Sequence, residues 1–110
     1  MSISTKITKL FGIKHPIILA PMALVTGGKL AAAVQKSGGL GVLAGAYCDP
    51  VFLRTELEKS EGTNPAIGFI TWKIKDSPEV LDIALKANPP AIWFSFGDFS
   101  PYVKQFKDRG

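Results

Sequence analysis

Very few side chains in this sequence of 110 residues could carry out acid–base or nucleophilic chemistry. His15 is the single histidine, Cys48 is the single cysteine, and Asp98 follows an apolar run near the C-terminus. A nucleophile needs a neighbouring base and a metal site needs several ligands, and neither grouping can be assigned around these residues. We therefore predict no catalytic residue and no metal site. His15 is expected to be structural, Cys48 a buried thiol of ordinary reactivity, and Asp98 part of a turn.

The positive charge of the chain, formally +4, is spread over separate lysines. Residues 1–48 contain five lysines and no acidic residue, whereas residues 49–110 contain eight basic and nine acidic side chains. A nucleic-acid-binding surface would cluster its basic residues and interleave them with aromatic ones. The spacing indicates solvated surface lysines, so we predict no nucleic-acid partner.

Targeting and membrane signals are missing from the sequence. No apolar run approaches the roughly 20 residues that a membrane-spanning helix needs. The N-terminal residues lack the apolar segment of a secretory signal, and one cysteine excludes an intramolecular disulfide framework. We expect a cytoplasmic protein that does not bind membranes.

Four short apolar runs recur at a nearly constant spacing. They occupy residues 16–22, 40–44, 66–70 and 91–96, and their starts lie 24, 26 and 25 residues apart. None of them alternates polar with apolar residues. Continuous apolar runs are typical of strands that are buried on both faces of a parallel sheet.

Helices are predicted between the runs, because start and stop signals punctuate the intervening segments. Asp49-Pro50, Ser77-Pro78 and Ser100-Pro101 each place an N-cap oxygen before a proline that suits the first helical turn. Helix ends are expected at the glycines 38–39 and 62, before the prolines 89–90, and at Gly110.

This alternation predicts an α/β fold in which four strand–helix units form a parallel sheet with right-handed crossovers. A doubly wound sheet would carry a glycine-rich phosphate loop after its first strand, and Gly27-Gly28 comes later without that spacing. An eight-stranded (βα)8 barrel needs about 250 residues. We therefore predict that residues 1–110 form a single partial domain, a (βα)4 unit that is the N-terminal half of a TIM barrel.

The loops that follow the strands are where such a barrel carries its functional site. Here these loops hold small residues, backbone and aromatic side chains, which suit a flat and largely apolar cofactor. At least two of four aromatic residues at these positions are expected to belong to the core instead. The four are Trp72, Trp93, Phe94 and Phe96.

Several segments resemble the nitronate monooxygenase family, whose members were formerly called 2-nitropropane dioxygenases. The similar segments are 16–23 (PIILAPMA), 30–34 (LAAAV) and 37–42 (SGGLGV), while 68–72 and 91–97 are most similar to its fungal-type members. The resemblance extends over nearly the whole chain, from Ile7 to Gly110. The strand end Ala-Pro-Met with Gly-Gly-Leu-Gly is also similar to related flavin barrels, including enoyl-acyl carrier protein reductases and, more distantly, inosine monophosphate dehydrogenases.

The resemblance implies an FMN-binding barrel that oxidises alkyl nitronates with O₂ to carbonyl compounds and nitrite. It also implies that the backbone of Ala20, Pro21, Met22 and Ala23 contacts the flavin. Many members have an asparagine at the end of strand three, and Thr71 is its expected replacement here. The catalytic histidine and the FMN phosphate loops of the family lie in the second half of the barrel. We therefore expect the 110-residue chain by itself to be inactive.

Two alternative functions remain open: a non-catalytic, truncated barrel fragment, and a flavin-dependent reductase that uses NAD(P)H and is related to enoyl-acyl carrier protein reductase.

Four parallel strands cannot close a barrel, and the outer strands keep unpaired N–H and C=O groups. We expect the inner face of the sheet to expose residues within 17–22, Phe69, Ile70 and residues within 93–96. The chain should therefore self-associate or pair with a missing C-terminal half.

Overall fold

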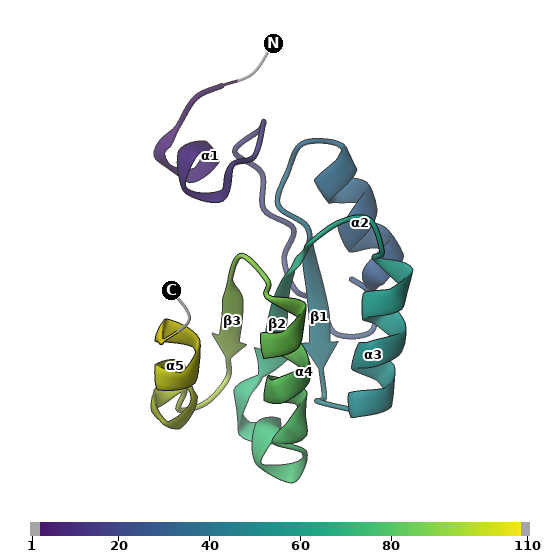
Figure 1. The fold of residues 1–110 in the computed structure, drawn as a ribbon, viewed down its shortest axis with the longest axis vertical. Coiled ribbons are helices and arrows are strands. Elements are labelled where there is room, and N and C mark those ends of the chain that lie inside the picture. Colours follow the sequence, from purple (N-terminus) through teal and green to yellow (C-terminus); the bar gives the residue numbers. More distant parts are fainter. Residues whose placement is uncertain (1–2, 109–110) are drawn as a thin grey trace.

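A computed structural model describes residues 3–108 of the chain and places helices on one side of a parallel sheet (Figure 1). The strands point toward one end of the molecule, and the first helix lies at the opposite end. In chain order the elements are α1 (Lys6–Phe11), α2 (Gly28–Lys36), β1 (Val42–Ala46), α3 (Pro50–Lys59), β2 (Ala66–Ile70), the 3₁₀ helix η1 (Thr71–Asp76), α4 (Glu79–Ala87), β3 (Ile92–Ser95) and α5 (Ser100–Lys107).

The sheet has three parallel strands in the order β1-β2-β3. Leu43 pairs with Ile67, and Ile67 pairs with Ile92, so consecutive strands are neighbours. The pairing of β1 with β2 shifts between Ala44 and Ala46, which is a local bulge next to the end of the strand. The predicted α/β class with parallel strand–helix units is confirmed.

The first apolar run, residues 16–22, was predicted to be a strand. This prediction is wrong for most of the run. It forms only one parallel bridge, between Ile18 and Leu40, with Leu19 N–H donating to Leu40 O at 3.0 Å. Pro16 and Pro21 lack the N–H groups that a paired strand would donate. The segment instead turns across the inner face, where Pro21 sits so close to Gly68 that a β-carbon at Gly68 would lie 2.5 Å from it.

Two short helices were not predicted. Helix α1 begins after Thr5, whose side chain accepts a hydrogen bond from Thr8 N–H, while the Thr8 hydroxyl accepts one from Thr5 N–H. The 3₁₀ helix η1 follows β2 directly. Both elements have only six residues, too few for a helical period to stand out from the sequence.

One of the three predicted caps is confirmed and two are wrong. Asp49 Oδ1 accepts hydrogen bonds from Val51 N–H and Phe52 N–H at the start of α3. Ser77 does not cap α4, because η1 ends immediately before it and Pro78 occupies the cap position. Helix α5 already includes Ser100, so Phe99 is its cap residue and makes no side-chain cap bond. The helix end expected at Gly110 lies outside the described residues.

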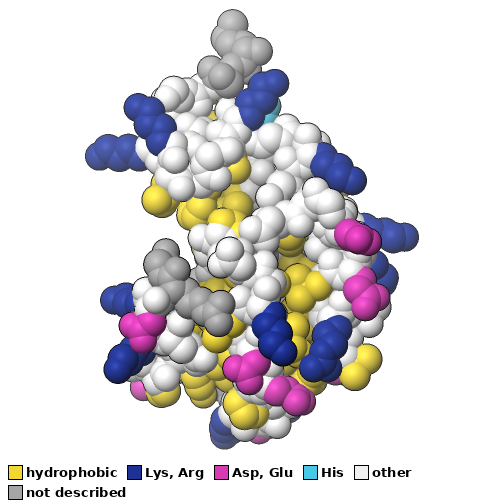
Figure 2. Space-filling view, viewed as in Figure 1, with side chains coloured by type: hydrophobic (Ala, Val, Ile, Leu, Met, Phe, Trp, Pro, Cys, Tyr) yellow, Lys and Arg dark blue, Asp and Glu magenta, His cyan; other side chains and the backbone are white. Residues whose placement is uncertain are grey.

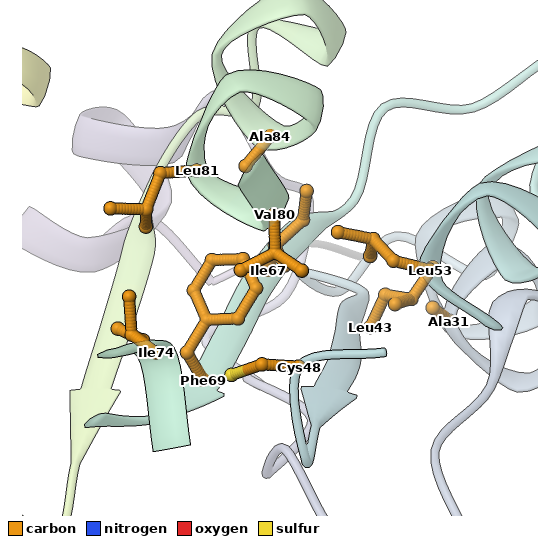
Figure 3. Close-up of a cluster of buried hydrophobic side chains, with 10 residues drawn as sticks. All are labelled: Ala31, Leu43, Cys48, Leu53, Ile67, Phe69, Ile74, Val80, Leu81 and Ala84. Carbon is orange, nitrogen blue, oxygen red and sulfur yellow. The ribbon is translucent and has the colours of Figure 1, made fainter. Parts of the chain in front are cut away.

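The main core lies between the sheet and helices α2, α3 and α4, with η1 closing one end (Figure 3). Phe69 belongs to this helix-facing core and is 2% exposed, so the expectation that it faces the inner side of the sheet is wrong. Of the four aromatic residues considered above, Trp93 and Phe94 pack against the two core clusters, while Trp72 and Phe96 are exposed. Two of the four thus pack against the core, although both are themselves only half-buried.

Gly27-Gly28 serves the packing of two helices. A β-carbon at Gly28 would overlap the carbonyl oxygen of Glu56 on α3. Gly28 N–H, at the start of α2, donates to Glu56 Oε1 at 3.3 Å. A carboxylate therefore already occupies the N-terminus of α2, which is the place where a phosphate would otherwise bind.

The inner face of the sheet is better covered than expected. A second core cluster of Leu40, Val42 and Ala66 lies there, with Ile18 and Trp93 packed against it. All four residues of β3 are only half-buried, and β2 is the one strand to which β3 pairs. A folded monomer of this mass should expose about 5,900 Å², whereas the chain exposes 6595 Å². The outer edge of β3 and part of the inner face thus remain uncovered.

We expect the 110-residue chain to self-associate through this edge and face. Light scattering should give a mass above 11.8 kDa that rises with concentration. Ser95→Lys places a charge on β3 at the inner face of the sheet, where Ser95 is half-buried, and should shift the mass toward that of a monomer. Val51→Lys, on α3, should leave the association unchanged. A concentration-independent mass of 11.8 kDa for the unmodified chain would contradict the expectation.

Candidate functional site

The segments that follow the strands meet at one edge of the sheet, which is the lower end of the molecule in Figure 1. A small pocket of about 80 Å³ opens there on the inner face. Residues that belong to, or directly follow, the first apolar run and each of the three strands line the pocket. They are Pro21, Ala23, Ala44, Ala46, Gly68, Phe69, Ile70, Ser95 and Phe96.

The sequence-predicted site residues are divided between this pocket and its surroundings. Pro21 and Ala23 line the pocket. Ala20 and Met22 are exposed, and Thr71 is buried at the start of η1 outside the lining.

The backbone of Met22 is already engaged within the chain. Its N–H donates to the Thr26 hydroxyl at 2.8 Å, and its carbonyl accepts from Val25 N–H and Thr26 N–H. Ala23 N–H, in contrast, has no hydrogen-bond acceptor among the described residues. Because Pro21 has no N–H, Ala23 is the residue of this segment that lines the pocket and could donate its N–H to a ligand there.

Small side chains form the strand part of the pocket lining, which we call the floor of the pocket. Ala44 and Gly68 lie side by side on neighbouring strands, and Pro21 rests on Gly68. A planar ring could lie against such a surface, so the residues present fit one face of a flavin. Ligand pockets usually enclose at least about 300 Å³, far more than this pocket, so the chain supplies one wall of such a site.

The sequence analysis missed the strand residues of this floor. Ala44 and Ala46 are separated by two positions, and Gly68 stands at the same level on the next strand. Because alternate residues of a strand face the same side, small residues at a spacing of two could have indicated a flat surface.

Backbone strain is concentrated at this edge of the sheet. Four non-glycine residues there have left-handed φ values: Leu24 (63°), Ala46 (49°), Cys48 (63°) and Phe96 (62°). The other such residue described, Asn88, ends helix α4. Left-handed backbone is unfavourable for bulky side chains, and such strain gathers at functional sites. The clustering therefore supports this edge as the candidate site.

Thr71 carries a buried hydroxyl without a partner. The residue is 2% exposed, and its Oγ1 has no hydrogen bond within the described part of the chain. Gly97 passes directly over it, since a β-carbon at Gly97 would lie 3.3 Å from the β-carbon of Thr71. Trp72 N–H donates to Phe96 O at 3.2 Å and joins the two loops. A polar atom left unpaired beside a pocket is available to a ligand that reaches it.

Cys48 is a buried thiol, as expected. Its side chain packs in the main core, and Sγ lies 3.8 Å from Ile70 O. Burial raises the pKa of Cys48 to about 11, although the positive charge of Lys73 acts in the opposite direction. The thiolate is the reactive form of cysteine, so Cys48 is not a nucleophile at neutral pH.

Three charged groups near this edge are engaged with one another or with backbone. Lys73 Nζ and Asp76 Oδ2 form an ion pair at 2.7 Å. Asp98 Oδ1 accepts from Ser100 N–H at 2.9 Å, and hydrogen bonding by the side chain and then by the backbone of Ser100 lowers the pKa of Asp98. Asp98 thus stabilises a turn, as predicted.

Neither His15 nor a metal cluster contributes to the site. His15 lies at the opposite end of the sheet, where its N–H donates to Gly38 O at 2.9 Å. Among residues 3–108 no group of three or more metal-ligating side chains comes together. Over the same residues, no helix is long and apolar enough to cross a membrane.

Thr71→Val should stabilise the chain by about 1 kcal/mol, because it removes a buried hydroxyl that makes no hydrogen bond. Thr26→Val is the matched control, since Thr26 is equally buried but bonds both backbone groups of Met22. It should destabilise the chain by about 1–3 kcal/mol. Urea unfolding measures both changes. Destabilisation by Thr71→Val would mean that Oγ1 is paired after all.

The free energy of unfolding should fall as the pH rises from about 9 to about 11, because the folded state holds the Cys48 proton more tightly than the unfolded state. The contribution of Cys48 to the free energy of unfolding is fully present below pH 9, and about 2 kcal/mol of it is lost across this range. Other groups also titrate there, so the measurement is the difference between the unmodified chain and Cys48→Ala in urea unfolding at each pH. A difference that does not depend on pH would refute the raised pKa.

Curated relatives match the chain over part of their length. The (3aS,4S,5R,7aS)-5-hydroxy-7a-methyl-1-oxo-octahydro-1H-indene-4-carboxyl-CoA dehydrogenase of Rhodococcus jostii (strain RHA1) is 26% identical over 99% of this chain and 31% of that protein. A probable nitronate monooxygenase of Staphylococcus saprophyticus is 40% identical over 52% of this chain and 16% of that protein. The chain thus spans at most about a third of these relatives.

The fold is similar to that of FabK from Thermotoga maritima, a TIM-barrel enzyme. The TM-score is 0.85 at 25% identity, over 99% of this chain and 36% of the FabK chain. This similarity agrees with a parallel sheet that forms part of a barrel.

The model of the nitronate monooxygenase family matches residues 4–88, which is more than half of the chain. That range holds the first apolar run, both helices that pack through Gly28, and strands β1 and β2 with their pocket residues. Its relatives, by their names, include oxidoreductases. The chain therefore belongs to the nitronate monooxygenase family, within a group of oxidoreductases that also includes FabK.

Proposed function

We propose that this chain supplies one wall of the FMN site in an oxidoreductase that oxidises alkyl nitronates with O₂ to carbonyl compounds and nitrite. The observation that carries the proposal is the flat floor of small side chains at the carboxyl edge of the sheet, in a member of the nitronate monooxygenase family. On this proposal residues 1–110 act as a single partial domain, the N-terminal half of the FMN-binding barrel.

Within the proposed site the chain binds and orients the flavin. Ala20, Pro21, Met22 and Ala23 form the segment beside the ring, and Ala23 N–H is the donor left free for it. The hydroxyl of Thr71 is the second candidate donor, once the loop over it moves. FMN, when bound, supplies the redox chemistry of the reaction.

The chain itself contributes no acid–base group to the proposed reaction. Cys48 is protonated at neutral pH, Asp98 is held in its turn, and Lys73 is paired with Asp76. At the N-terminus of α2 the flavin phosphate would meet the carboxylate of Glu56, which already accepts from Gly28 N–H. Proton transfer and phosphate binding are therefore assigned to parts of the barrel other than this chain, and the isolated chain should be inactive.

A second candidate is a flavin-dependent reductase that uses NAD(P)H. It is favoured by the similarity to FabK, which extends over nearly the whole chain. The floor of the pocket would serve either reaction, because both need one face of a flavin ring to be covered.

Titration of the ¹⁵N-labelled chain with FMN, followed by NMR, tests the site. Binding should be weaker than about 1 μM, because no phosphate site is present, and the shifted amides should include Ala23, Gly68 and Ser95. Ala23→Leu should weaken FMN binding about tenfold, because the larger side chain fills the pocket without changing its charge. Ala33→Leu, an exposed alanine on α2, should not. Met22→Leu should not either, because the Met22 side chain is exposed and does not line the pocket.

Shifts confined to other surfaces, or equal effects of both alanine variants, would contradict the proposed site. The reaction is tested separately in flavin-loaded protein that contains the rest of the barrel, because the isolated chain should be inactive. O₂ uptake should depend on propane-2-nitronate and not on NADH. Oxidation of NADH without a response to the nitronate would favour the reductase.

A further inference from the structure

Thr26 connects two parts of the candidate pocket without lining the pocket itself. The residue is 1% exposed and lies between the first apolar run and helix α2. On one side its hydroxyl bonds Met22, the neighbour of the pocket residue Ala23. On the other side its carbonyl accepts from the N–H of Ala44, a pocket residue on β1, at 2.8 Å. One buried residue thus links the segment beside the pocket to the pocket floor.

The hydroxyl of Thr26 is used both as acceptor and as donor. Its oxygen accepts from Met22 N–H at 2.8 Å, and its proton is donated to Met22 O at 3.2 Å. The backbone N–H groups of Thr26 and Val25 donate to the same carbonyl at 2.9 and 3.0 Å. Side chain and backbone together therefore close a turn over residues 22–26. A valine has the same shape as threonine but could make neither of the two side-chain hydrogen bonds.

The 22–26 turn contains strained backbone that these hydrogen bonds must hold in place. Leu24, at its centre, has a φ of 63°, in the region that favours glycine. Its side chain adds little to the core in return, since it is 77% exposed. Strained backbone persists only where the surrounding structure over-determines it. Without the Thr26 hydroxyl the turn should therefore relax, and Ala23 would move with it.

The packing of α2 on α3 gives Thr26 a fixed position. Gly28 donates its N–H to Glu56 Oε1 at 3.3 Å, and a β-carbon on either Gly27 or Gly28 would overlap Glu56. Figure 2 shows charged side chains gathered at the surface over α3 and α4, whereas Glu56 is only 8% exposed. The start of α2 cannot shift without disturbing this buried contact. Thr26 is thus a rigid point from which the turn is held.

We propose that Thr26 is a positioning residue of the flavin site. Its hydroxyl holds the 22–26 turn so that the free N–H of Ala23 stays at the pocket, and its carbonyl holds Ala44 in the floor. Thr26 acts through these neighbours and does not touch the flavin. The inference rests on the proposed function, which supplies the ligand. Loss of the hydroxyl should lower the fraction of the chain that is ready to bind, and the apparent affinity should fall in proportion.

Hydrogen exchange of the ¹⁵N-labelled chain tests the turn without flavin. In Thr26→Val the amides of Met22 and Ala44 should exchange at least about tenfold faster, because the hydrogen bonds of the hydroxyl are lost. Rates are taken relative to the β2 amides, which corrects for a change in global stability. Thr26→Ser keeps the hydroxyl and should restore most of the protection.

Ser60→Ala is the matched control. Ser60 is 2% exposed, and its hydroxyl donates to Leu57 O at 2.7 Å at the C-terminal end of α3. The variant also removes a buried hydroxyl, but it should leave the relative exchange of Met22 and Ala44 unchanged.

FMN titration of the same variants tests the role in the site, with each affinity corrected for the folded fraction from urea unfolding. Thr26→Val should weaken FMN binding at least about fivefold, Thr26→Ser less than about twofold, and Ser60→Ala not at all. Leu24→Gly relieves the strained φ and, combined with Thr26→Val, should restore part of the affinity. If Thr26→Val alone does not fold, this double variant takes its place and should bind FMN more weakly than Leu24→Gly alone.

Unchanged relative exchange in Thr26→Val would overturn the positioning role. So would equal FMN affinities of Thr26→Val and the unmodified chain, a result that leaves the flavin site standing. Absence of FMN binding to the unmodified chain would instead overturn the proposed site, while the exchange rates would still show whether Thr26 holds the turn. The two proposals therefore fail separately.

Discussion

The parallel pairing of β2 with both of its neighbours is the constraint on which the rest of the structure depends. A parallel sheet must be covered on both faces, because each connection crosses from one end of a strand to the start of the next. Helices α2, α3 and α4 cover one face with a continuous core (Figure 3). The other face is covered by the first apolar run together with Phe11 and Ile13, and there β2 is buried while β3 stays half-buried.

The same pairing brings together the residues of the candidate site. Parallel strands end at one edge, so the segments after β1, β2 and β3 meet there without any special sequence signal. The floor needs small side chains. Pro21 packs directly on Gly68, so this position tolerates a larger side chain least. Left-handed backbone at Leu24, Ala46 and Phe96 is the conformational cost of turning away from the sheet at this edge.

The carboxylates of the chain mostly stabilise helices and turns. Glu56 bonds the first turn of α2, Asp49 caps α3, and Asp98 holds the turn before α5. Negative groups at helix N-termini are favourable, and this use leaves the pocket without an acid or base. What remains at the pocket is backbone, small side chains and aromatic rings. That composition agrees with a chain of the nitronate monooxygenase family that contributes apolar surface rather than acid–base groups at this edge of the sheet.

The sequence by itself determined the elements whose signals are local. The apolar run 66–70 coincides with β2, and Asp49 caps α3 as its residue type predicts. Cys48 is buried among apolar residues, as expected. The spacing of the runs was enough for the parallel α/β class, because connections of this length exclude hairpins. Tertiary structure alone decided the path of residues 16–22, where two prolines left the segment free to cross the inner face. It also decided which side of the sheet Phe69 faces, and it left the hydroxyl of Thr71 without a partner. These outcomes depend on contacts between residues far apart in the chain, which local propensity and periodicity do not encode.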